Sequence, residues 1–143
     1  KDFTIDPYMI YQARTLGASA ILLICSLLSQ SELEEYQAIA TELGMSALVE
    51  AHDEQEVEMA LRAEASIIGV NNRDLKTFTV DINNSARYRK MVPKEVSFVS
   101  ESGIKTAEDI AKLLENGTDA VLIGETLMRS ENKKQALDEL RGM

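Results

Sequence analysis

Short apolar runs recur along this chain at a regular spacing. They lie at about residues 20–26, 46–51, 66–71, 96–101 and 119–124. Stretches with helical period separate them, which is the βαβ pattern of a parallel sheet covered by helices. The chain has no low-complexity segment and no linker rich in Pro, Gly or Ser. We therefore expect residues 1–143 to form a single domain.

Two of the expected helices carry informative end signals. A helix over residues 31–43 begins with Ser31 and Glu34, which have the spacing of a capping box. A second helix begins at Asp53, a favourable N-cap residue. Its end is unusual, because Glu64 occupies the position at which glycine is favoured. We expect backbone strain there.

Polar or small residues lie at the end of four of the apolar runs or directly after it, at the carboxyl ends of the expected strands. They are Glu50, Asn71, Arg73, Glu101, Ser102, Gly103, Gly124 and Glu125. Burying polar groups without partners costs roughly 1–3 kcal/mol each, so a hydrophobic core gives no reason for them. A ligand-binding mouth explains this placement.

The same pattern indicates the class of fold. Functional groups after several successive strands are typical of a (β/α)8 barrel, whose active site is built from the βα loops. An open doubly wound sheet shares the alternation, but it gathers its ligand groups at one switch point, and no GxGxxG motif follows a strand here. A complete barrel needs about 250 residues, whereas this chain has 143. The prediction is an α/β fold of the TIM-barrel family, present as an incomplete barrel.

Composition excludes several classes of partner. The net charge of −9 and the lack of a Lys/Arg run argue against binding nucleic acid or an anionic membrane surface. No apolar run approaches the roughly 20 residues of a membrane span. The single cysteine, Cys25, lies within an apolar run and excludes a disulfide framework, so a reducing cytoplasm is expected. Neither nucleic acid nor a membrane is therefore expected as a partner.

Five segments together resemble indole-3-glycerol phosphate synthase, in the family's order and at its spacing, from Lys1 to about Leu140. They are "KDFTIDPYMIYQARTLGASAILLI", "ALVEAHDEQEVEMAL", "IIGVNNRDLKTFTVD", "VSESGIKTAEDI" and "DAVLIGETLMR". The resemblance implies that Lys1 is the last residue of strand three of a barrel. The five apolar runs are then strands four to eight.

The resemblance also implies a reaction. The family converts 1-(2-carboxyphenylamino)-1-deoxyribulose 5-phosphate to indole-3-glycerol phosphate, with loss of carbon dioxide and water and without a metal or organic cofactor. Lys1 matches the general acid that protonates the substrate carbonyl, and Glu50 matches the catalytic glutamate, a base for dehydration. Asn71 resembles the active-site asparagine that positions substrate hydroxyls. Arg73 resembles the arginine that receives the anthranilate carboxylate, which a guanidinium can bind in bidentate fashion.

The phosphate end follows from the residue types themselves. Small residues after the last two strands, Ser102, Gly103 and Gly124, lie where barrels often bind phosphate with backbone N–H groups. Glu125 is expected to contribute only its backbone N–H, with its side chain turned away. Glu101 repels phosphate, and the resemblance assigns it to substrate hydroxyls instead.

For two polar residues beside these positions we expect no role in the chemistry. His52 is the only histidine and lies two residues after Glu50. The resemblance gives it no function, so a surface or capping role is expected. Asn72 is interpreted as a turn residue, because asparagine readily occupies turns.

The first strand of the family supplies another glutamate and another lysine, which this chain lacks. We therefore expect a fragment that is inactive alone, with open strand edges that favour self-association or complementation by the missing N-terminal segment. Two alternatives remain open. One is a noncatalytic half-barrel that self-associates. The other is a different phosphate-binding barrel enzyme, such as a relative of phosphoribosylanthranilate isomerase, which would not combine Lys1, Glu50 and the "NNRD" motif.

Overall fold

The computed structural model describes residues 2–74 and 77–142 of the chain. Five strands form one parallel sheet, namely β1 (Ala20–Ile24), β2 (Ser46–Ala51), β3 (Ile67–Asn71), β4 (Ser97–Glu101) and β5 (Ala120–Leu122). The helices are α1 (Pro7–Thr15), the 3-10 turn η1 (Cys25–Leu27), α2 (Gln30–Glu42), α3 (Glu54–Arg62), α4 (Asn83–Arg89), α5 (Ala107–Glu115), α6 (Glu125–Arg129) and α7 (Lys133–Leu140). All five expected strands are confirmed.

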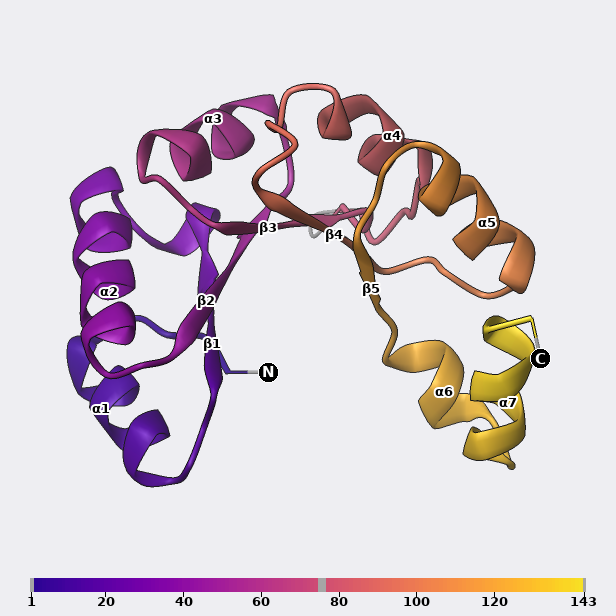
Figure 1. The fold of residues 1–143 in the computed structure, drawn as a ribbon, viewed down its shortest axis with the longest axis horizontal. Helices are drawn as coiled ribbons and strands as arrows, with labels where there is room; N and C mark the ends of the chain where they lie inside the picture. The colour runs from indigo at the N-terminus through magenta and orange to yellow at the C-terminus, as the bar shows by residue number, and fades with distance from the viewer. Residues whose placement is uncertain (1, 75–76, 143) are drawn as a thin grey trace.

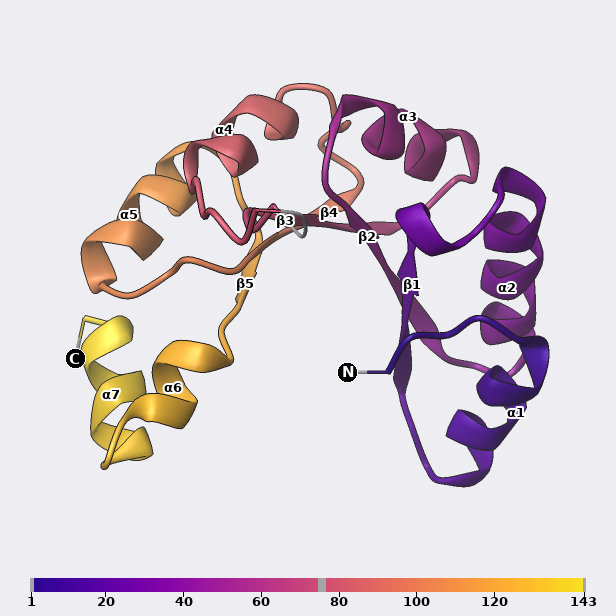
Figure 2. The ribbon, with the colours of Figure 1, turned by 180° about the vertical axis from the view of Figure 1, so that it is seen from behind.

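The sheet order identifies the architecture. Each strand pairs in parallel with the next one along the chain, in the order β1-β2-β3-β4-β5. A doubly wound sheet would reverse direction at a switch point. Here the strands follow one another around an arc, and helices α2 to α5 cover its convex side (Figures 1 and 2). The structure is thus a partial (β/α)8 barrel, as predicted, with β1 and β5 at its two ends.

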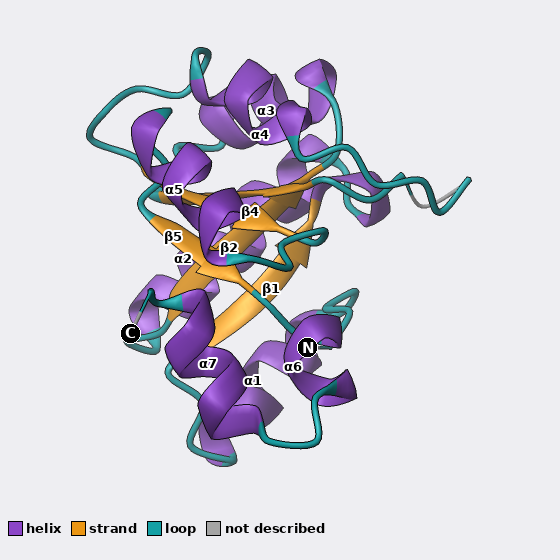
Figure 3. Cartoon of the chain, turned by 90° about the vertical axis from the view of Figure 1, so that its right-hand side faces the viewer, coloured by secondary structure: helices purple, strands orange, loops and turns teal. Residues whose placement is uncertain are grey.

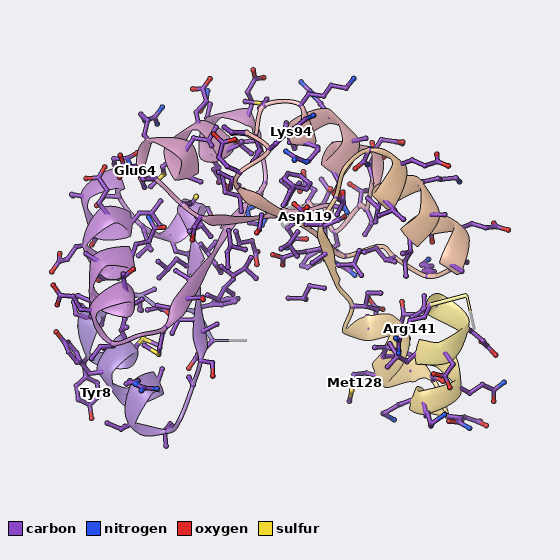
Figure 4. All side chains as sticks on the ribbon, in the orientation of Figure 1. Tyr8, Glu64, Lys94, Asp119, Met128 and Arg141 are labelled. Atoms are coloured by element: carbon purple, nitrogen blue, oxygen red, sulfur yellow. The ribbon has the colours of Figure 1, made fainter. Side chains whose placement is uncertain are left out.

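The main core fills the layer between the strands and the outer helices. Figure 3 shows α3 and α4 lying on one side of the strands, and side chains occupy the layer between strands and helices in Figure 4. Its fully buried members include Leu23, Leu33, Val49, Val57, Ile68, Val70 and Phe98. Aliphatic residues dominate because strands of a parallel sheet are buried on both faces.

The helix ends correct one prediction and confirm another. The N-cap of helix α2 lies two residues earlier than expected, and its capping box consists of Ser29 and Glu32, not Ser31 and Glu34. Both serines lie three residues before a glutamate, so the spacing alone cannot choose between them. At the end of α3, Glu64 has a φ of 55°. This left-handed conformation costs a non-glycine residue energy, as expected from its position.

Cys25 lies just beyond β1, in η1, and not inside the strand as the apolar run predicted. Its thiol is buried and donates to the Glu56 carbonyl at 3.6 Å. Burial raises its pKa to about 12, with a further contribution from Glu56. Within residues 2–74 and 77–142, no helix has the length and apolar character needed to cross a membrane.

Candidate active site

Three of the predicted polar side chains lie together at the carboxyl ends of adjacent strands. Glu50 of β2 is 1% exposed, Asn71 of β3 is 5% exposed and Glu101 of β4 is 1% exposed. Asn71 and Glu101 are direct partners in the ladder between β3 and β4. The Asn71 Nδ2 donates to Glu50 Oε1 at 3.0 Å, and its Oδ1 accepts from the Arg73 N–H at 3.1 Å. Asn71 therefore fixes the Glu50 carboxylate and the start of the following loop.

The buried position of the Glu101 side chain depends on a glycine in the neighbouring strand. A Cβ atom added to Gly69 in β3 would collide with the Glu101 carboxylate. Gly69 also pairs with Glu50 of β2 and Val99 of β4 in the sheet. Only glycine leaves room for a buried carboxylate at this point of the strand. Gly69 is not among the predicted site residues, although an isolated glycine within a strand signals such a close approach.

A cavity of about 910 Å³ brings six of the nine predicted site residues together. They are Arg73, Glu101, Ser102, Gly103, Gly124 and Glu125. Glu50 and Asn71 lie beside it in the sheet. The ninth, Lys1, lies outside the described residues. The cavity opens at the carboxyl ends of β4 and β5, where barrel enzymes bind their ligands.

The side chain of Glu125 does not turn away from the site as expected. Its carboxylate accepts from Arg73 Nη2 at 2.7 Å and from Arg129 Nε at 2.9 Å. These hydrogen bonds, from Arg129 first and Arg73 second, lower the pKa of Glu125. Arg73 and Glu125, which both line the cavity, are thus joined by a charge-assisted hydrogen bond.

The loop after β4 adopts a backbone conformation that favours glycine, whereas Gly124 after β5 has a φ of −110° and open space around it. Ser102 has a φ of 67° and Gly103 one of 80°, so two consecutive residues are left-handed. A Cβ on Gly103 would collide with Val80. The Thr126 hydroxyl donates to the Ile104 carbonyl at 2.7 Å and ties the loop after β5 to the loop after β4. Thr126 also lines the cavity, beside Gly124 and Glu125.

Asn72 is not a surface turn residue but the centre of a buried network. It has no exposed surface. Its Nδ2 donates to Ser100 Oγ at 3.0 Å and to the Ser102 carbonyl at 3.1 Å. Its Oδ1 accepts from the Ser85 N–H at 3.1 Å and the Ser85 hydroxyl at 2.8 Å. Asn72 therefore satisfies the Ser85 N–H in the first turn of α4, although Asn72 lies outside that helix. Its hydrogen bond to the Ser102 carbonyl also helps to hold Ser102 in its left-handed conformation.

We expect Asn72→Ala to lower the free energy of unfolding by about 3 kcal/mol, because buried groups of Ser85 and Ser100 lose their partner. Urea denaturation measures this. Asn83→Ala is the matched control, since Asn83 is exposed and its side chain bonds only to Asp81 Oδ1 among the described residues. Equal destabilisation by both substitutions would contradict the role of Asn72.

His52 is also not a surface residue. Its side chain is 14% exposed and lies between two carboxylates. The Nε2 atom is 3.3 Å from Glu50 Oε1, and Nδ1 is 3.0 Å from Glu56 Oε2. The carboxylate of Glu50 and then that of Glu56 raise the pKa of His52 to about 9, against an opposing effect of burial. Sequence reasoning missed this contact, because it follows from the geometry of the β2–α3 turn.

This shift predicts a pH dependence of stability. A histidine whose pKa rises from 6.5 to about 9 on folding stabilises the folded state. This stabilisation is fully present below pH 6.5 and is lost as the pH rises through 9. We expect a loss of about 3 kcal/mol over this window, at about 1.4 kcal/mol per pKa unit. Urea denaturation at fixed protein concentration from pH 6 to 9 measures it, and His52→Gln should flatten the profile. The effect of the Cys25 thiol begins only above its ordinary value of 9.0, so an unchanged slope in His52→Gln would contradict the assignment.

Comparison with known proteins identifies the relatives of this chain. Residues 1–140 match the family model described as indole-3-glycerol phosphate synthase. The chain is 61% identical to the indole-3-glycerol phosphate synthase of Ruminiclostridium cellulolyticum, over 99% of the chain and 55% of that protein. It is 53% identical to that of Leuconostoc mesenteroides, over 99% of the chain and 54% of that protein. The chain thus spans about half the length of the curated relatives it matches.

Solved structures support the fold alone, because their identities are low. A chain of the tryptophan synthase a2b2 complex from Pyrococcus furiosus matches with a TM-score of 0.73 at 17% identity, covering 96% of this chain and 60% of that one. A mandelate oxidase mutant matches with a TM-score of 0.74 at 16% identity, covering 95% of this chain and 51% of that one. In each, this chain corresponds to roughly half of a larger fold.

Proposed function

Because the chain belongs to the indole-3-glycerol phosphate synthase family, we propose that it supplies the carboxyl-terminal part of that enzyme's active site. The proposed substrate is 1-(2-carboxyphenylamino)-1-deoxyribulose 5-phosphate, and the proposed reaction is its ring closure to indole-3-glycerol phosphate with loss of carbon dioxide and water. The class is that of a carbon-carbon lyase. The alternative of a phosphate-binding isomerase loses support, because the family model and the relatives cited above all carry the synthase name.

One observation carries the proposal: a single cavity has a carboxylate-binding residue and two glycine loops, next to a buried carboxylate. Arg73 and the loops at Gly103 and Gly124 line this cavity. The substrate has a carboxylate at one end and a phosphate at the other, so we place its anthranilate carboxylate at Arg73 and its phosphate at the loops. Backbone N–H groups suit a phosphate because they donate without bulk.

The chemistry assigned to each group follows from its surroundings. Attack of the aromatic carbon on the protonated carbonyl forms the new carbon–carbon bond, and Lys1 is the proposed acid. Loss of carbon dioxide leaves its bonding electrons in the ring. Dehydration then removes a proton and a hydroxyl, and we assign the proton to Glu50, which Asn71 holds in place at 3.0 Å. Glu101 lines the cavity and is assigned to the substrate hydroxyls.

The test uses a joined protein, in which this chain is fused behind the N-terminal part of the Ruminiclostridium cellulolyticum relative. Formation of indole-3-glycerol phosphate is followed by its fluorescence. We expect turnover by the joined protein and none by the chain alone, because the family's first strand supplies a further glutamate and lysine. A folded joined protein without turnover would overturn the proposed function.

A further inference from the structure

His52 lies between two carboxylates that come from different elements. Glu50 is on β2, and Glu56 is on α3, one turn beyond the Asp53 N-cap. The Glu56 Oε2 atom accepts from the His52 backbone N–H at 2.8 Å and lies 3.0 Å from its Nδ1. Two contacts from one carboxylate oxygen fix both the backbone and the ring of His52. The ring then presents Nε2 to Glu50 at 3.3 Å.

This arrangement determines the protonation of the ring. Carboxylates offer only lone pairs, so each ring nitrogen that faces one must carry a hydrogen. A neutral imidazole has a hydrogen on one nitrogen only and would direct a lone pair at the other carboxylate. His52 therefore fits its site as an imidazolium cation, which donates to Glu56 from Nδ1 and places its positive Nε2 side 3.3 Å from the Glu50 carboxylate, within ion-pair distance although not in hydrogen-bond geometry.

The neighbouring groups favour the same charge state. Glu50 faces the ring from β2 and Glu56 from α3. The Cys25 thiol of η1 interacts electrostatically with Glu56, Asp53 and Glu50. The side chain of Asp53 caps α3 by accepting from the Glu56 N–H at 2.9 Å. Within residues 2–74 and 77–142, no His, Cys, Asp and Glu side chains form a group suited to a metal ion. The cluster is thus an ion-pair network with the cation in the middle.

We propose that His52 is a positioning residue for Glu50, and that its ring, oriented by Glu56, fixes both the direction and the negative charge of the carboxylate that acts as base. This inference rests on the proposed function, in which Glu50 removes a proton during dehydration. Glu50 is 1% exposed, and burial makes a carboxylate take up a proton more readily, whereas a neighbouring cation opposes this effect. Asn71 fixes the same oxygen from β3, and His52 places a positive charge beside it.

The first experiment measures the ring directly and needs no activity. His52 is the only histidine of the chain, so a histidine-free affinity tag gives a single imidazole signal by proton–carbon NMR. We expect a titration midpoint near 9, and a downward shift of this midpoint in Glu56→Gln. Glu58→Gln is the matched control, because Glu58 is on the same helix but pairs with Arg62 at 3.6 Å and is 55% exposed. A midpoint near the ordinary 6.5 would overturn the inference.

The second experiment measures catalysis in the joined protein. We expect His52→Gln to lower kcat about tenfold with little change in KM, and to move the acid limb of the kcat profile to higher pH. Gln can still donate a hydrogen bond but has no charge, so His52→Lys should recover part of the loss. Glu56→Gln should lower kcat in the same direction with His52 in place.

The outcomes of these two experiments distinguish a failure of the proposed function from a failure of the positioning role of His52. An inactive joined protein overturns the proposed function, and the NMR titration then still decides whether His52 is the cation between Glu50 and Glu56. An active joined protein in which His52→Gln keeps the parent's kcat and pH profile overturns the positioning role. A loss of kcat without any movement of the pH profile also overturns it, because a structural role would act in that way.

Discussion

Replacing Glu50 with glutamine in the joined protein is expected to reduce kcat by about 10³, the typical contribution of a positioned general base. Gln keeps the shape of the side chain and its carbonyl can still accept from Asn71 Nδ2, which now donates to Glu50 at 3.0 Å. It cannot take up a proton. The loss is therefore expected in kcat, with KM within about threefold of the parent value.

The measurement is the rate of indole-3-glycerol phosphate formation by fluorescence, with glycerol 3-phosphate as a competitive probe of the phosphate end. Its inhibition constant should not change, because Glu50 does not line the cavity formed by the Gly103 and Gly124 loops. Glu58→Gln again serves as the control on α3. Near-normal turnover by Glu50→Gln would remove this residue from the mechanism.

The strands of this fold could be predicted from the sequence, because each is a short apolar run between helical stretches. The barrel rather than an open sheet could be predicted as well, since polar residues follow several strands, and the sheet order confirms it. Positions at strand ends are also determined by this pattern. Glu50, Asn71 and Glu101 therefore came together as expected.

Contacts between side chains of different elements could not be predicted in this way. Asn72 follows Asn71 directly, yet the alternation of a strand turns it to the other side, where it binds Ser85 and Ser100. The ring of His52 meets Glu56 because the chain turns sharply into α3. Periodicity shows on which element a residue lies, but not which partner completes its hydrogen bonds.

The described sheet is open at both ends, which affects how this chain associates when no further strands are present. Strands β1 and β5 end the described sheet and do not pair with each other. Apolar side chains near the two ends are exposed, including Tyr8 on α1 at 68% and Met128 on α6 at 71% (Figure 4). Unpaired backbone groups at a sheet edge bind another strand readily, and exposed apolar surface favours association.

The chain alone is therefore expected to self-associate and to show no synthase activity. Size exclusion with light scattering should give a mass of at least twice 15.8 kDa, whereas the joined protein should not associate through these edges. Leu122→Lys places a charge on β5, where Leu122 is 43% exposed, and should reduce association. Leu114→Lys is the matched control, because Leu114 is 72% exposed on α5, away from the sheet edge. A monodisperse, active monomer would contradict the expectation, because an open arc leaves the pairing groups of β1 and β5 without partners from the rest of a barrel.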